Sequence, residues 1–130
     1  MQGDVIHKLE VEMVVSQVRQ WTVADYYRMA ATGLLHPEEQ VELISGQILQ
    51  MTPQGSLHAA TTDYASETLR EALTGQALIR TEKPLQINDY SEPRPDIAVV
   101  RLHPTRYADA HPTPLQVYLL MRFRTLAQCH

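Results

Sequence analysis

The stretch EPRPDIAVVR, residues 92–101, decides how the centre of the chain folds. Proline fixes its own φ and pushes the preceding residue to extended geometry, so the chain enters Asp96 already straight. The apolar run that follows predicts a buried strand over residues 97–102. Asp96 therefore lies at the mouth of a core strand, where a carboxylate needs a cation, a metal or several donors. On this stretch alone, the alternative of a turn-capping aspartate is favoured.

Length and composition predict one soluble globular domain. The chain has 130 residues, of which 44% are hydrophobic and 20% charged, enough to bury a core. A net charge of −4 argues against a protein that coats nucleic acid, which would be strongly basic. It does not exclude a metal-dependent enzyme acting on nucleic acid, because such sites are themselves acidic.

The sequence shows no signal for secretion or for insertion into a membrane. The single cysteine, Cys129, cannot form an internal disulfide and fits a reducing compartment. No apolar run approaches the roughly 20 residues that span a bilayer, and the N-terminus lacks a signal-peptide core. We expect a cytoplasmic protein that does not contact membranes.

Short elements are expected on both sides of the central stretch. Thr22 and Asp25 form a capping-box pattern at the start of a helix that Gly33 ends. Residues 41–51 read as two strands around a Ser45–Gly46 turn. Further strands are expected over residues 77–80, 85–87 and 117–120, the last of them buried. Residues 1–20 fit either a frayed helix or an extension, because Val11, Val14, Val15 and Val18 share a helical face but are mediocre helix formers.

A longer helix is expected from about Ser56 to Thr74, with Gly75 as its terminator. Its predicted core-facing stripe consists of Leu57, Tyr64, Ala65, Thr68, Leu69, Ala72 and Leu73. His58 lies in the first turn. A packing or hydrogen-bonding role is the simpler interpretation of a lone histidine, although a helix N-terminus also favours anions and makes a role next to phosphate conceivable.

Glu42 lies within the first predicted strand. By alternation its side chain faces opposite to those of Val41 and Leu43. Without further context, a solvated glutamate on the outer face of the sheet is the favoured interpretation.

Several motifs, in order and spacing, resemble the Uma family of bacterial restriction-endonuclease-like proteins, a group of unknown function with the PD-(D/E)XK nuclease-like fold. The resemblance covers about residues 21–120. It rests on Trp21-Thr22-Val23-Ala24-Asp25-Tyr26-Tyr27, Val41-Glu42-Leu43-Ile44-Ser45-Gly46-Gln47-Ile48, Met51-Thr52-Pro53, Ser56, His58, Pro95-Asp96-Ile97-Ala98-Val99-Val100, Tyr107, His111-Pro112 and Val117-Tyr118-Leu119-Leu120.

The resemblance implies an α+β fold in which a mixed sheet is flanked by helices. It also implies a site for Mg²⁺ or Mn²⁺ built from acids on adjacent elements, with DNA as the substrate. Carried over by motif, Glu42 is the early acid and Asp96 the central metal ligand. His58 matches a recurrent histidine and completes the candidate catalytic set.

The chain departs from the family pattern after residue 120. Arg122 stands where the family has a glutamate, and no lysine follows Lys83. A two-acid site with an arginine in the third place loses an anion and gains a cation, which disfavours a divalent metal. We therefore expect a domain over residues 21–120 that is incomplete at its C-terminus through truncation or a frameshift, with a non-homologous tail over residues 121–130. We also expect it to be inactive as a nuclease and to expose Leu119 and Leu120.

Two alternatives remain open at this stage. One is a non-catalytic nucleic-acid-binding or protein-interaction module that retains the fold. The other is an unrelated small α+β domain in which every acid named is structural. Whether two copies pair, and whether DNA or RNA is preferred, the sequence leaves undecided.

Overall fold

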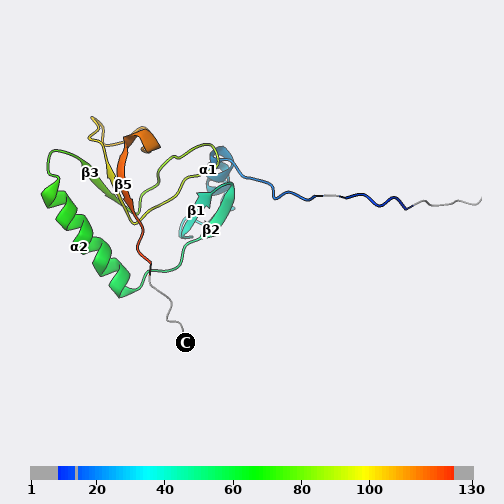
Figure 1. Cartoon of the computed structure of the whole chain (residues 1–130), viewed down its shortest axis with the longest axis horizontal. Coiled ribbons are helices and arrows are strands. Elements are labelled where there is room, and N and C mark those ends of the chain that lie inside the picture. Colours follow the sequence, from blue (N-terminus) through cyan, green and yellow to red (C-terminus); the bar gives the residue numbers. More distant parts are fainter. Residues whose placement is uncertain (1–8, 14, 125–130) are drawn as a thin grey trace, which may run out of the picture.

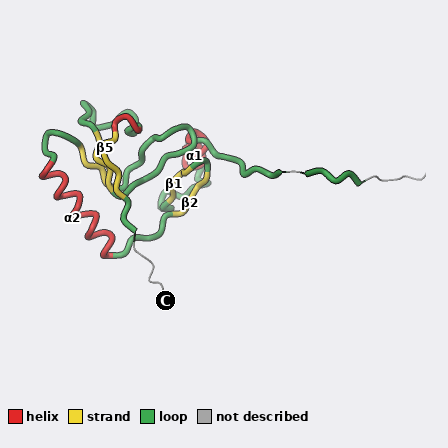
Figure 2. Tube along the Cα trace, in the orientation of Figure 1, coloured by secondary structure: helices red, strands yellow, loops and turns green. Residues whose placement is uncertain are grey.

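A computed structural model describes residues 9–13 and 15–124 (Figures 1 and 2). The described part is of the α+β class, as predicted. Its elements are α1 (Val23–Ala31), β1 (Val41–Ile44), β2 (Gln47–Gln50), α2 (Ser56–Ala72), β3 (Leu78–Thr81), β4 (Ile97–Val100), a 3-10 helix (Pro114–Gln116) and β5 (Val117–Met121). Among these residues, neither α-helix is long and apolar enough to cross a membrane.

The strands divide between two antiparallel sheets. The hairpin β1–β2 forms one, and the other has the order β3-β4-β5. Figure 1 shows α2 along one side of the three-stranded sheet, with α1 and the hairpin on the opposite side.

The strand predicted after Asp96 is the centre of the larger sheet. All four residues of β4 are buried, and the strand pairs with β3 on one edge and β5 on the other. The strand ends at Val100 and not at residue 102. Its pairing with β5 becomes irregular between Val99 and Val100. Leu85 and Tyr107 pack with Ala98 and Val100 to form the core.

The hairpin turn follows from its sequence. Ser45 and Gly46 both have positive φ, of 47° and 76°, as expected for a two-residue turn whose twist matches that of the flanking strands. The preceding segment lies against this turn, because the Trp21 N–H donates to the Gly46 carbonyl.

The start of α1 is also as predicted. The Asp25 N–H donates to the Thr22 hydroxyl, and the Thr22 N–H donates to the Asp25 carboxylate, completing the capping box. The Tyr26 hydroxyl donates to the Val41 carbonyl, which joins α1 to the hairpin.

The predicted apolar stripe of α2 is confirmed only in part: Ala65, Leu69 and Leu73 are half-buried, but Thr68 and Ala72 are exposed. Leu57 and Tyr64 are each 76% exposed, whereas Thr62 and Ser66 are the buried residues of the helix. The helix packs against β3. Thr62 and Ser66 lie on the same side of the helix as the half-buried Leu69 and Leu73, so small polar and larger apolar side chains share the covered face.

Three further expectations change. Residues 85–87 form no strand: Pro84 lacks an N–H, and the Leu85 and Ile87 N–H groups donate only to the nearby loop over residues 91–93. β5 is an edge strand with exposed side chains, not a buried one, although the exposure of Leu119 and Leu120 was predicted. Residues 9–13 and 15–20 contain no helix; residues 1–8, 14 and 125–130 lie outside the described residues.

Replacing Gly46 by alanine should destabilise the domain. At φ +76° a side chain is strained, and an added Cβ would meet the Gln20 Cβ at 2.4 Å. We expect a loss of about 1–3 kcal/mol in the free energy of unfolding, measured by urea denaturation.

Gly33 is the matched control, because it has φ +82° but nothing within 4 Å of an added Cβ. Gly33→Ala should therefore cost less than Gly46→Ala. Equal losses would show that the contact with Gln20 contributes nothing.

Candidate functional site

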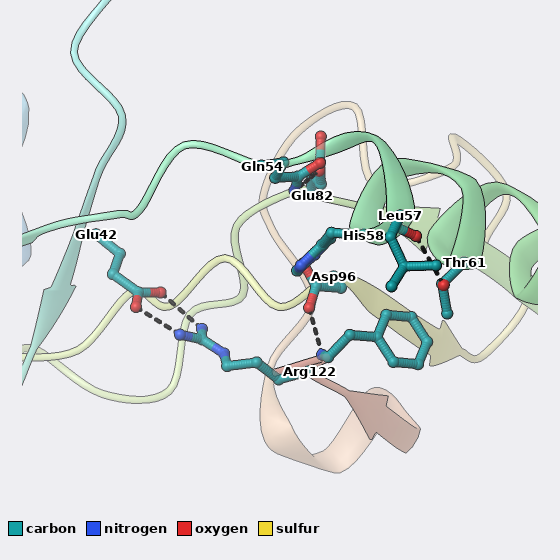
Figure 3. Close-up of polar contacts among 9 residues, drawn as sticks. Glu42, Gln54, Leu57, His58, Thr61, Glu82, Asp96 and Arg122 are labelled. Atoms are coloured by element: carbon teal, nitrogen blue, oxygen red, sulfur yellow. Dashed lines mark hydrogen bonds and ion pairs between the residues drawn. The ribbon is translucent and has the colours of Figure 1, made fainter. Parts of the chain in front are cut away.

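The three predicted site residues lie at one cavity of about 250 Å³ (Figure 3). Glu42 comes from β1, His58 from the first turn of α2, and Asp96 from the residue before β4. The cavity is also lined by Arg94, Arg122 and Phe123. Residues separated widely in sequence are thus brought together where the hairpin meets the larger sheet.

Asp96 is held by donors from other elements. Its side chain is buried, with Oδ1 lying 2.9 Å from His58 Nε2. Oδ2 accepts from the Phe123 N–H at 2.6 Å. These partners are 38 and 27 residues away along the chain, so Asp96 is not the local turn cap that was the favoured interpretation.

Glu42 is not the solvated outer-face glutamate that alternation favoured, because it is only 5% exposed. Arg122 covers it with two parallel hydrogen bonds, Nη1 to Oε1 and Nη2 to Oε2, each 2.7 Å long. The Arg94 backbone N–H donates to Oε2 at 3.0 Å. The loop before β4 and the residue after β5 therefore bury the outer side of β1.

The contact between Glu42 and Arg122 favours the charged form of both side chains. Hydrogen bonding from Arg122 lowers the pKa of Glu42, and burial only partly opposes this effect. Acceptance by Glu42 in turn raises the pKa of Arg122. The Arg122 side chain remains 49% exposed, so one end of the pair reaches solvent while the carboxylate does not.

The residues as arranged do not fit a divalent metal. Each of the four carboxylate oxygens of Glu42 and Asp96 already has a nitrogen partner from the protein. Mg²⁺ requires hard oxygen ligands in near-octahedral geometry, and a bound guanidinium repels it. Within the described part of the chain, no three His, Cys, Asp or Glu side chains are grouped to hold a metal ion.

Sequence reasoning missed the partner of Glu42. It identified Arg122 only as a cation in the position of an acid, not as a contact of an acid 80 residues away. It also missed the Phe123 N–H, since a backbone donor carries no signal in residue type. The position of Arg122 directly after an apolar strand was the one available indication.

A comparison with family models matches residues 23–123 to the Uma2 family, described as "Putative restriction endonuclease". The chain belongs to the Uma2 family. The predicted family resemblance is thus confirmed, and the match includes Glu42, His58, Asp96 and Arg122. Neither the curated proteins nor the solved structures contain a match to the chain.

Removing the guanidinium should destabilise this Uma2 domain. Among the described residues, Arg122→Ala leaves Glu42 with the Arg94 N–H as its one remaining donor. We expect a loss of about 1–3 kcal/mol in urea denaturation at neutral pH, less than for a fully buried pair because Arg122 is half exposed. The exposed Arg124 provides the control, Arg124→Ala, and an equal loss in both variants would contradict a specific pair.

The lowered pKa of Glu42 predicts a pH dependence. A depressed folded-state pKa contributes stability above the unfolded-state value of about 4.3, and this contribution is lost as pH falls through the folded-state pKa. Glu42→Gln should therefore be less stable at neutral pH but lose less stability between neutral and acid pH. Urea midpoints across that range test this. The exposed Glu67→Gln should follow the parent profile; parallel profiles for parent and Glu42→Gln would refute the expectation.

Proposed function

We propose that this Uma2 domain is an endonuclease-type domain that takes DNA as its ligand but does not hydrolyse it. The family match supports a nuclease-type origin. The observation that carries the second half of the proposal is the double hydrogen bond between Arg122 and Glu42. The carboxylate that would bind a metal is instead neutralised by a cation of the chain itself.

The chemistry explains why this contact matters. Metal-dependent phosphodiester hydrolysis uses Mg²⁺ or Mn²⁺ to polarise the phosphate and to lower the pKa of an attacking water. Glu42 and Asp96 are the acids that would hold such an ion, but their oxygens accept hydrogen bonds from Arg122, Arg94, Phe123 and His58. A guanidinium carries positive charge but has no coordinated water to activate.

Ligand binding is better supported than catalysis. The half-exposed guanidinium of Arg122 has donors suited to phosphate oxygens, and Arg94 lines the same cavity. Arginine binds phosphate without a metal, so a DNA backbone could be held at this cavity with no hydrolysis.

A second candidate function is a protein-interaction module. Tyr118, Leu119 and Leu120 are all exposed on β5, which within the described part of the chain pairs with β4 alone. An exposed apolar edge strand is a template for pairing with another chain.

Plasmid nicking in Mg²⁺ or Mn²⁺ tests the absence of catalysis. We expect the parent protein and Asp96→Ala to give the same background of nicked plasmid. Metal-dependent nicking by the parent that disappears in Asp96→Ala would overturn the proposal.

Mn²⁺ affinity supplies a readout independent of activity. The parent should bind Mn²⁺ weakly, and Arg122→Gln should bind it more tightly because the competing cation is gone. Arg124→Gln is the matched control and should behave like the parent. Isothermal titration calorimetry measures all three, and unchanged affinity in Arg122→Gln would show that Arg122 does not block the acids.

A further inference from the structure

A second cavity, of about 300 Å³, shares Arg94 as a lining residue with the cavity that contains Glu42 and Asp96. Its walls come from α1, the start of β1, the loop before β4 and the segment before the 3-10 helix. The residues that carry its chemistry are Tyr26, Tyr27, Glu92, Arg94 and His111. We call the cavity that contains Glu42 and Asp96 the acidic cavity. Four of these five residues do not line it: Tyr26, Tyr27, Glu92 and His111.

Glu92 is the most unusual group in this cavity. It is only 3% exposed, yet among the described residues its carboxylate has a single side-chain partner, the Tyr27 hydroxyl, which lies 2.7 Å from both oxygens. One hydroxyl donates one proton, so most of the accepting capacity of the carboxylate is unused. No ion pair to Glu92 occurs among the described residues. A buried carboxylate with so few donors is costly unless a further donor reaches it.

Two residues that line this cavity, Arg94 and His111, also contain a buried nitrogen atom. His111 Nδ1 and Arg94 Nε are buried without a hydrogen-bond partner in the part of the chain that the structure describes. Burial and hydrogen bonding to Glu92 raise the pKa of Tyr27 above its ordinary value, and its protonated hydroxyl is the donor in this contact. The cavity thus combines an anionic acceptor, a cationic donor and an imidazole with two aromatic rings.

We propose that this cavity binds a nucleobase that carries an exocyclic amine. A carboxylate accepts hydrogen bonds from such an amine, as glutamate does from the N4 amine of cytosine. Arg94 and His111 supply polar partners for the ring nitrogen or oxygen beside the amine, and the tyrosine rings supply apolar surface for the base. The charged lining residues are two acids, Glu39 and Glu92, and one arginine, Arg94, so a ligand that donates hydrogen bonds is favoured over an anion.

Arg94 links this cavity to the acidic one. Its side chain lines both cavities, and its backbone N–H donates to Glu42. A base unstacked from a DNA strand could therefore enter the second cavity while its backbone lies near Arg122. Binding of a base from a DNA strand rests on the proposed function. Binding of a free nucleoside does not depend on it.

Deoxycytidine and deoxyuridine test the proposal, because position 4 of the ring carries an amine in the first and a carbonyl in the second, and the neighbouring N3 is an acceptor in the first and an N–H donor in the second. We expect the full chain to bind deoxycytidine about tenfold more tightly, as one well-formed base contact discriminates. Deoxycytidine should also shift the NMR resonances of Tyr27 and the His111 ring in a saturable way. Equal binding of the two nucleosides, no binding, or shifts confined to His58 would overturn the proposal.

Glu92→Gln provides the second test. An amide can donate to the carbonyl of deoxyuridine as well as accept from an amine, so the preference should disappear. Glu38→Gln, at an exposed position outside this cavity, should retain it. A folded Glu92→Gln protein that still prefers deoxycytidine tenfold would overturn the assignment. If Glu92→Gln does not fold, the NMR mapping of the parent decides.

The trinucleotides d(TCT) and d(TUT) distinguish a base within a DNA strand from a free nucleoside. Tighter binding of d(TCT) than of deoxycytidine indicates a base within a strand, and equal or weaker binding indicates a free nucleoside. Both results support the cavity as a base site. Because none of these measurements needs metal or cleavage, failure of the proposed function would leave the nucleoside preference intact, and the reverse also holds.

Discussion

The arrangement of this Uma2 domain depends on how two buried carboxylates are satisfied. Glu42 and Asp96 lie in one cavity, and each takes its donors from segments far away in the chain. An ionised group with neither a charge partner nor enough donors would be too costly at these positions. The Arg122 guanidinium, the Phe123 N–H and the Arg94 N–H therefore fix the end of β5 and the loop before β4 against β1. The same contacts that complete the fold remove the oxygens a metal would need.

Structural and catalytic demands on a nuclease-type site conflict at Arg122. A metal ion would neutralise the two acids and activate water, whereas an arginine neutralises one acid and activates nothing. About half of the surface of the Arg122 side chain is exposed to solvent, whereas the Glu42 side chain is buried. The ion pair is therefore only partly buried. We propose that this fold, by satisfying its acids internally, retains a cavity for DNA without hydrolysing it.

Local patterns were predictable, and packing between distant segments was not. The capping box at Thr22, the Ser45–Gly46 turn and the strand after Asp96 follow from short-range rules, and all three are present. Alternation placed Glu42 outside because the rule contains no information about which segment covers the hairpin. The apolar periodicity of α2 was right for Leu69 and Leu73 but missed Thr62 and Ser66, because it considers only apolar residues and these two buried side chains are polar. The identities of the candidate acids came from the family resemblance, but their partners required the three-dimensional arrangement.

A double-mutant cycle between Glu42 and Arg122 tests the central claim most directly. Glu42→Gln, Arg122→Gln and the double variant are compared with the parent by urea denaturation at neutral pH. We expect the double variant to be more stable than the sum of the single losses predicts, with a coupling of about 1–3 kcal/mol, because either single change leaves its partner unsatisfied. Additive losses within about 0.3 kcal/mol would contradict the pair and reopen the acids to a metal.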